Sequence, residues 1–223
     1  MTRPVSNSVV SRPARRAVAL VAVLCLAGAV ACAQEPDGEA RQEPALPTTT
    51  TTTGPARSVT GVLLGASSSP DERGFAAEKA VVEALEQAIG RTLDINHNFY
   101  GWEEPFPSEV ERWDLQLGRI PMISWNGKGV TTSTIAAGRY DQLIRQRARS
   151  TKALGRPVLI RWFWEMDGNK KAEFAESPEQ YVAAWQRIVR IFRAQGADNV
   201  SWVWCPNASA FNDGAAQKFY PGD

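Results

Sequence analysis

Beyond residue 58, hydrophobic and polar positions follow two patterns that alternate along the chain. Short runs rich in β-branched and other apolar residues predict strands, and longer segments with apolar residues every three or four positions predict helices. The predicted strands cover residues 59–66, 93–99, 120–125, 157–164 and 200–204. The predicted helices cover residues 78–90, 108–117, 135–154 and 177–196. A helix therefore separates each predicted strand from the next.

The ends of these helices carry recognisable signals. Ser177 and Pro178 are typical of a helix N-cap and first turn, and Gln180 completes a capping box. Gly90 and Gly196 are typical of helix C-termini, because glycine accepts the left-handed backbone conformation found there. These signals support the boundaries of the first and last predicted helices.

Strands that alternate with helices pair in parallel and are joined by right-handed crossovers. The predicted fold class is therefore α/β. Two architectures satisfy the periodicity, a doubly wound open sheet and an eight-stranded barrel. No glycine-rich phosphate loop follows the first predicted strand, which argues against a nucleotide-binding open sheet.

The carboxyl ends of the predicted strands share an unusual composition. In parallel α/β folds, these ends and the loops after them form the active site. Polar and aromatic residues gather there in four segments, residues 96–102, 125–127, 164–168 and 204–207. We therefore expect a site built from several strands at this edge of the sheet.

Glu165 is the candidate for acid chemistry. It follows an apolar strand and three aromatic residues, Trp162, Phe163 and Trp164. Poor solvation of its anion in such surroundings would raise the pKa of the carboxyl group and make it a proton donor near neutral pH. The alternative is a structural salt bridge from Glu165 to Arg161 or to a helix.

Other residues at the strand ends are candidates for binding a substrate. His97 is expected either to orient a carboxylate or a sugar hydroxyl, or to serve only the structure. Trp125 and Trp204 either offer flat faces to sugars or pack in the core. The substrate-binding candidates are His97, Trp102, Trp125, Arg161, Trp164, Trp204 and Asn207. The sequence predicts neither a metal site nor a cofactor.

The N-terminal residues predict an export signal. Arg12, Arg15 and Arg16 precede an apolar run, residues 17–31. This run is shorter than the roughly 20 residues that a membrane-spanning helix needs, and it is typical of a secretory signal peptide. Residues 1–31 are therefore the predicted signal peptide, of the lipoprotein type.

Two cleavage sites fit the end of this signal. A lipobox would cleave before Cys32 and attach a lipid to it, whereas an ordinary signal peptidase would cleave after Ala33. Residues 32–57 are rich in threonine and proline and are predicted to form a disordered linker to a domain at 58–223. The protein is thus expected to be secreted and held at the outer face of the cell membrane through Cys32.

Charge and cysteine content narrow the range of partners. The formal net charge is +1, which favours neither nucleic acid nor an acidic membrane surface. Eight tryptophans supply flat apolar surfaces that suit sugars as well as a core. The cysteines are Cys25, Cys32 and Cys205, so no disulfide framework is expected, and Cys205 is predicted to be a buried thiol without chemistry.

Several segments of the predicted domain are distinctive in residues and in order. The clearest is residues 161–168, Arg-Trp-Phe-Trp-Glu-Met-Asp-Gly. The others are residues 138–141, 181–185, 196–204 and 220–223. Together they resemble glycoside hydrolase family 26, and the likeness runs from about residue 59 to residue 223.

This resemblance implies a (β/α)8 TIM barrel that hydrolyses β-linked polysaccharides, most often β-1,4-mannan, by a retaining mechanism. In the family, the glutamate after the fourth strand is the general acid/base, which corresponds to Glu165. The residue before it is commonly histidine but here is Trp164, which leaves mixed-linkage glucan, β-1,3-xylan and other β-glycans open as substrates. The expected state is a monomer whose partner is a β-glycan.

The resemblance also implies a nucleophilic carboxylate after the seventh strand. A retaining mechanism places it about 5 to 5.5 Å from the acid/base. The sequence reaches Asp223 before a sixth strand, and a barrel takes about 250 residues, so we expect a barrel truncated after about strand five and inactive alone. The alternative from another class is a non-catalytic, surface-tethered lipoprotein that binds glycans.

Overall fold

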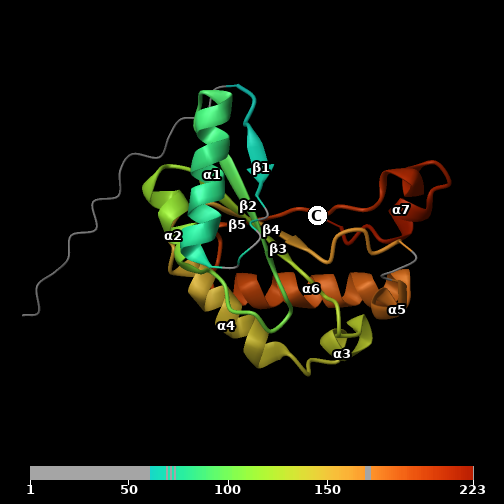
Figure 1. Ribbon diagram of the computed structural model, residues 1–223. Helices are drawn as coiled ribbons and strands as arrows, with labels where there is room; N and C mark the ends of the chain where they lie inside the picture. Colours follow the sequence, from blue (N-terminus) through green and yellow to red (C-terminus); the bar gives the residue numbers. More distant parts are fainter. Residues whose placement is uncertain (1–60, 69, 71, 73, 169–171, 223) are drawn as a thin grey trace, which may run out of the picture. The chain divides into compact units, whose positions relative to one another are not determined.

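The computed structural model describes residues 61–68, 70, 72, 74–168 and 172–222 (Figure 1). The predicted signal peptide, the predicted linker and the start of the predicted first strand lie outside these residues. In the described part of the chain, no helix is both long enough and apolar enough to cross a membrane. What the sequence indicates for residues 1–57 stays a prediction.

Among the described residues, five strands form one parallel sheet. They are β1 (Gly65–Ser67), β2 (Ile95–Tyr100), β3 (Ile120–Trp125), β4 (Val158–Trp162) and β5 (Val200–Trp202). Each strand pairs with the next one in the chain, in the order β1-β2-β3-β4-β5. A doubly wound sheet reverses its strand order at a switch point, whereas a barrel adds each strand beside the last. The observed order is that of the barrel.

Helices join the strands, as predicted. They are α1 (Phe75–Ile89), α2 (Glu109–Gln116), α3 (Thr132–Ala136), α4 (Asp141–Lys152), α5 (Ala172–Ala175), α6 (Pro178–Ala194) and α7 (Ala215–Lys218), with a 3-10 helix η1 (Ala208–Phe211) before α7. Each of the first four strands is followed by at least one helix before the next strand begins. The βα alternation read from the hydrophobic pattern is confirmed.

The caps explain where two of these helices begin. The hydroxyl of Ser177 accepts a hydrogen bond from the backbone N–H of Gln180 at 3.2 Å, and Pro178 occupies the first turn of α6. At the start of α2, Ser108 and Glu111 form a full capping box. Both helices therefore start within a residue of the predicted position.

The single predicted helix over residues 135–154 is wrong. The structure has two helices there, α3 and α4, because the chain turns at Gly138, which has φ of 89°. A side chain at position 138 would collide with Arg187 of α6. The Nε of Arg187 also donates to Asp141 at the start of α4, at 2.7 Å. The break is set by packing against α6, which a local pattern does not contain.

The predicted first, fourth and fifth strands are longer than those observed, and β5 ends at Trp202 instead of residue 204. β1 comprises only Gly65–Ser67, and β4 ends at Trp162. Phe163 leaves the strand with φ of 45°, a conformation that non-glycine residues adopt only at a cost. The apolar pattern continues into Phe163 and Trp164 because these residues pack against the domain without being part of the sheet.

Burial alternates along the central strands. Val158, Ile160 and Trp162 of β4 are fully buried, whereas Leu159 and Arg161 between them are half-buried. The buried face packs against helices; the ring of Trp162 stacks on Tyr181 of α6 at a centroid distance of 5.3 Å. Helices α4 and α6 run along this side of the sheet (Figure 1). The described residues thus leave the opposite face of the sheet open.

An ion cluster lies at the amino end of β3. Arg119, 2% exposed, donates from Nε and Nη2 to Glu86 of α1 at 3.0 and 2.7 Å, and from Nη1 to Asp114 of α2 at 3.2 Å. Asn96 of β2 donates to both carboxylate oxygens of Asp114 at 3.2 and 3.1 Å. Burial raises the pKa of Asp114 to about 6, although Asn96 and Arg119 act in the opposite direction. These four residues, the amino-end cluster, tie two helices to the sheet.

Candidate active site

Polar side chains from neighbouring strands meet on the open face of the sheet. Arg161 of β4 donates from Nε to the hydroxyl of Ser124 of β3 at 2.8 Å, and from Nη2 to Nε2 of His97 of β2 at 3.3 Å. The Ser124 hydroxyl and His97 Nε2 are 2.6 Å apart. Nη1 of Arg161 lies 3.8 Å from the sulfur of Cys205, which follows β5. We call these four residues the carboxyl-end cluster.

The hydrogen bonds of this cluster define the protonation of His97. A guanidinium only donates, so Nε2 of His97 is the acceptor for Arg161 and its ring proton resides on Nδ1. Ser124 then accepts from Arg161 and donates to the same Nε2. Burial, and then the charge of Arg161, lower the pKa of His97 to about 4. At neutral pH the imidazole is neutral, with Nδ1–H available as a donor.

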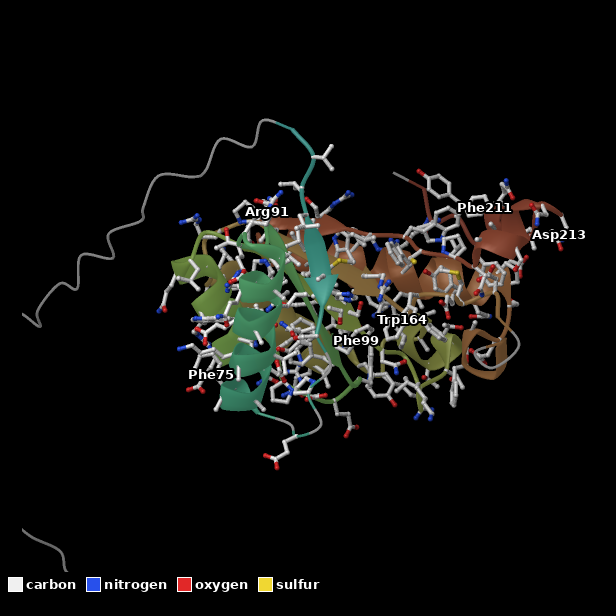
Figure 2. The ribbon with its side chains drawn as sticks, turned by 45° about the horizontal axis from the view of Figure 1, so that its top comes forward. Phe75, Arg91, Phe99, Trp164, Phe211 and Asp213 are labelled. Atoms are coloured by element: carbon white, nitrogen blue, oxygen red, sulfur yellow. The ribbon has the colours of Figure 1, made fainter. Side chains whose placement is uncertain are left out.

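Two aromatic rings lie beside the guanidinium of Arg161. Phe99 at the end of β2 and Trp164 after β4 meet edge to face, with ring centroids 5.4 Å apart (Figure 2). The guanidinium carbon of Arg161 lies 5.0 Å from the Trp164 ring and 5.7 Å from the Phe99 ring, within the range of a cation–π contact. The ring of His97 packs against Phe99 at 4.5 Å. Phe99 and Trp164, the aromatic pair, therefore lie beside the carboxyl-end cluster on the open face.

Glu165 stands in a strained turn next to this pair. Its φ is 55°, and that of Phe163 is 45°. Such conformations cost about 1–3 kcal/mol each for non-glycine residues and persist only where the surroundings enforce them. The backbone N–H of Phe163 donates to the carbonyl of Trp125 at 3.0 Å, and that of Glu165 donates to the carbonyl of Cys205 at 2.7 Å. The turn is thus fixed from both sides, by β3 and by the segment after β5.

Asp167 and Asn207 shape the rest of the loop. The carboxylate of Asp167 accepts from the backbone N–H of Asn207 at 3.0 and 3.2 Å and from its amide nitrogen at 3.0 Å. A methyl group on Gly168 would lie 2.9 Å from that amide nitrogen, so the close approach requires glycine. The carboxylate of Asp167 therefore fixes the shape of the loop. The amide nitrogen of Asn207, a predicted substrate contact, is engaged in holding the loop.

Two of the predicted substrate contacts are corrected by the structure. Trp125 is 0% exposed and Trp102 is 3% exposed, and their rings stack at 4.4 Å in the core. The indole N–H of Trp125 donates to the carbonyl of Trp102 at 3.0 Å. Neither ring has a face open to a sugar, because Trp125 projects to the covered side of β3.

The surroundings expected for Glu165 also differ from those observed. Trp162 and Phe163 are buried among the helices, at 0% and 1% exposure, whereas Glu165 is exposed. The positive φ values of Phe163 and Glu165, on either side of Trp164, turn these side chains in different directions. Of the three aromatic neighbours, only Trp164 lies on the open face, where it is half-buried. The poor solvation predicted for the Glu165 carboxyl is therefore not found among the described residues.

The third predicted platform, Trp204, is half-buried after β5. It packs edge to face against Tyr220 and Phe211, at centroid distances of 5.2 and 6.1 Å. These contacts account for its position as part of a small aromatic group beside η1. No contact to the carboxyl-end cluster is present among the described interactions of Trp204.

Three residues of the site were not among the predicted site residues: Ser124, Cys205 and Phe99. Ser124 links His97 to Arg161, and Cys205 holds Glu165 through its carbonyl. Strand periodicity contained the signal for Ser124, since it alternates with residues on the covered face of β3. Cys205 contributes its backbone carbonyl, and the residue type in the sequence does not indicate which carbonyl accepts such a bond.

The described residues have no group of three or more His, Cys, Asp or Glu side chains arranged to hold a metal ion. The polar groups of the site are the hydrogen-bonding side chains of His97, Ser124 and Arg161. Consecutive parallel βα units, with such groups gathered at the carboxyl ends of the strands, define a (β/α)-barrel domain with a candidate active site.

Comparison with known proteins specifies this class. Residues 132–223 match the model of glycosyl hydrolase family 26, and over these residues the chain belongs to that family. Endoglucanase H of Acetivibrio thermocellus is 31% identical over 159 residues, which cover 67% of this chain and 18% of the relative. A β-1,3-xylanase of a Vibrio species is 31% identical over 107 residues, covering 45% and 21%.

A solved family 26 β-mannanase from Bacteroides ovatus shares the fold. Its TM-score is 0.54 at 14% identity, and the match covers 73% of this chain and 58% of that one. The α/β fold with consecutive parallel strands therefore matches part of a family 26 TIM barrel. The chain spans 18% and 21% of the lengths of the two curated relatives.

Proposed function

We propose that this chain provides the acid/base part of a retaining glycoside hydrolase site that acts on β-linked polysaccharide. The observation that carries the proposal is the position of Glu165. Its exposed carboxyl follows β4 in a strained turn, directly after Trp164 of the aromatic pair. Strain enforced by surrounding hydrogen bonds is typical of residues whose position serves function.

In the proposed mechanism, Glu165 first protonates the glycosidic oxygen as the leaving sugar departs. It then acts as a base towards the water that releases the second sugar from the enzyme. The nucleophile of that mechanism is assigned to none of the described residues. Asp167 is unsuited to it, because its carboxylate is engaged by the backbone and side chain of Asn207.

The carboxyl-end cluster is proposed to hold the sugar beside Glu165. Arg161 and the Nδ1–H of neutral His97 supply donors for hydroxyl oxygens on the open face. The resemblance favours mannan as substrate, whereas the two curated relatives are named for glucan and β-1,3-xylan hydrolysis.

The decisive experiment replaces Glu165 by Gln in the intact protein. Hydrolysis of β-glycan should fall by about 10²–10⁴-fold, the usual contribution of a general acid/base. Turnover of aryl glycosides with acidic leaving groups should fall far less, because their departure needs no proton. Folding should be unaffected, since the side chain is exposed.

The matched control is Glu83→Gln, which changes an exposed carboxyl on α1 whose side chain is 53% accessible. It should leave turnover of every substrate unchanged. Equal losses on activated and natural substrates in Glu165→Gln would contradict an acid/base role. Glycan binding without turnover by the unsubstituted protein would favour the alternative, a non-catalytic glycan-binding lipoprotein.

We further propose that the enzyme is exported and tethered by a lipid. The supporting residues are the apolar run 17–31, the thiol of Cys32 directly after it, and the polar linker that follows. Mass spectrometry of the mature N-terminus should find Cys32 as the first residue with a diacylglyceryl mass. A mature protein that begins at Gln34 would instead indicate ordinary secretion without an anchor.

A further inference from the structure

The backbone pairing between β4 and β5 continues past the ends of both strands, but its register changes. At the start of β4, the N–H of Val158 donates to the carbonyl of Asn199 at 2.9 Å, 41 residues further along the chain. Beyond the strand, the N–H of Glu165 donates to the carbonyl of Cys205 at 2.7 Å, only 40 residues further. The β4 side therefore contains one extra residue, which makes a bulge where φ turns positive at Phe163 and Glu165.

Glu165 begins this continued pairing but does not complete it. In a parallel ladder, a residue donates through its N–H to one residue of the neighbouring strand and accepts, through its carbonyl, from the N–H two residues further on. For Glu165, that second donor would be the N–H of Asn207. The carbonyl of Glu165 instead accepts from the N–H of Gly168 at 3.0 Å, because a φ of 55° turns the backbone out of the strand direction.

The carboxylate of Asp167 takes the place of that carbonyl. Its two oxygens accept from the backbone N–H of Asn207 at 3.0 and 3.2 Å, and one of them also accepts from the side-chain amide of Asn207 at 3.0 Å. A backbone N–H that has lost its ladder partner is stabilised by such a side-chain acceptor. The left-handed conformation of Glu165 is thus compatible with the pairing of the two segments because Asp167 supplies the missing acceptor.

We propose that Asp167 is a positioning residue for Glu165, which keeps the turn in the conformation that presents the carboxyl directly after Trp164. Without the Asp167 carboxylate, the N–H of Asn207 would recover an acceptor if Glu165 returned to an extended conformation, and this return would move the Glu165 side chain. Misplacing a catalytic group by about 1 Å can cost about 10²-fold in rate. The role rests on the proposed function, in which Glu165 is the acid/base.

The first test follows the turn itself, by NMR measurement of amide hydrogen exchange in the full 223-residue chain. In Asp167→Ala, the N–H of Gly168 should exchange about tenfold faster, the scale of one lost hydrogen bond. This N–H donates to the carbonyl of Glu165 and not to Asp167, so its exchange reports movement of that carbonyl. An unchanged exchange rate at Gly168 would overturn the proposal.

Asp198→Ala is the matched control for both tests. Asp198 is an exposed aspartate before the amino end of β5, at the opposite end of the strand from Asn207. Its substitution should change neither the exchange of Gly168 nor turnover. Thermal unfolding should verify that each variant folds.

The second test measures turnover by the intact protein. Asp167→Ala should lower kcat for β-glycan by about 10²-fold and leave KM unchanged, because the carboxyl of Glu165 is misplaced while the substrate still binds. Aryl glycosides with acidic leaving groups should lose far less, because their departure needs no proton. Equal losses on both kinds of substrate, or a rise in KM alone, would overturn the proposal.

A double substitution tests whether geometry or charge matters at Asp167. Asp167→Asn combined with Asn207→Asp exchanges the two side chains. The amide carbonyl at position 167 can then accept from the backbone N–H of residue 207, and its NH2 group can donate to the carboxylate opposite. We expect this variant to recover slow exchange at Gly168 and most of the turnover. A double variant as impaired as Asp167→Ala would contradict a positioning role.

Two combinations of results separate this role from the proposed function. If Glu165→Gln hydrolyses β-glycan normally while Asp167→Ala speeds the exchange of Gly168, Asp167 holds the turn but the acid/base assignment fails. If Glu165→Gln loses activity as expected while Asp167→Ala changes neither exchange nor turnover, the acid/base assignment stands and the positioning role fails.

Discussion

Arg119 and Arg161 lie at opposite ends of the same sheet, and they differ in what surrounds them. Arg119 precedes β3 and is buried between two carboxylates, Glu86 and Asp114. Arg161 is near the end of β4, is half-buried, and its described partners are all uncharged. The amino-end cluster is closed by opposite charges, whereas the carboxyl-end cluster leaves its positive charge directed at an open face.

Backbone strain is distributed in the same way. Phe163 and Glu165, beyond the carboxyl end of β4, both have positive φ. The residues of the amino-end cluster have no such conformation among those described. In barrels, catalytic residues lie at the carboxyl ends of the strands, whereas residues at the amino ends contribute mainly to stability. In this domain the division is visible in charge pairing and in backbone geometry.

The largest expected effect is on the amino-end cluster. Arg119→Met leaves the buried Asp114 and the half-buried Glu86 without their cation, which should lower the free energy of unfolding by about 3–5 kcal/mol. Arg161→Met removes hydrogen bonds to uncharged partners and should cost about 0.5–1.5 kcal/mol. Urea unfolding of both variants measures the difference. Equal losses of unfolding free energy in the two variants would contradict the proposed difference between the two ends of the sheet.

A smaller effect of opposite sign is expected at the carboxyl end. Glu165→Gly relieves a φ of 55° and should raise the free energy of unfolding by up to about 1 kcal/mol. The same change at Glu83, inside α1, should lower it by about 1 kcal/mol, because glycine is a poor helix former. Thermal and urea unfolding give both values. A destabilised Glu165→Gly variant would argue that the turn is not strained.

The sequence contains enough to predict the fold because its signals are local. Alternation of apolar and polar positions places β3 at residues 120–125, which are its observed bounds, and Ser177 with Pro178 marks the start of α6. The break between α3 and α4 is not local, since it depends on Arg187 packing against Gly138. Strand order also depends on pairing between distant segments, which is why two architectures fitted the pattern.

The candidate site was predictable in part. Glu165, His97, Arg161 and Trp164 gather at one edge, as the carboxyl ends of parallel strands should. The prediction for Trp125 considered only its position at the end of a strand. Alternate residues of a strand face the same side of the sheet, and Trp125 shares the covered face with Ile123. The strained turn was beyond prediction, since the positive φ of Glu165 is enforced by the carbonyl of Cys205, 40 residues further on.

The pH dependence of stability offers the finest comparison of the two clusters, because each has one group with a shifted pKa. The pKa of His97 falls from 6.5 to about 4, so between these values the unfolded chain binds a proton that the folded one does not. Stability from His97 is therefore present above pH 6.5 and is lost as the pH falls to about 4. The pKa of Asp114 rises from 3.8 to about 6, so its contribution is present below pH 3.8 and is lost as the pH rises to about 6.

The two contributions oppose each other over the same range, roughly pH 4 to 6, and substitution separates them. Relative to the unsubstituted chain, His97→Gln should gain stability as the pH falls from 6.5 to 4, whereas Asp114→Asn should lose it. Urea unfolding at several pH values measures both differences. His97 is the chain's one histidine, so an NMR titration reports its pKa directly. Arg161→Met should move that pKa upward, because the guanidinium charge contributes to the shift; a His97 that titrates near 6.5 would mean that the carboxyl-end cluster does not hold the imidazole neutral.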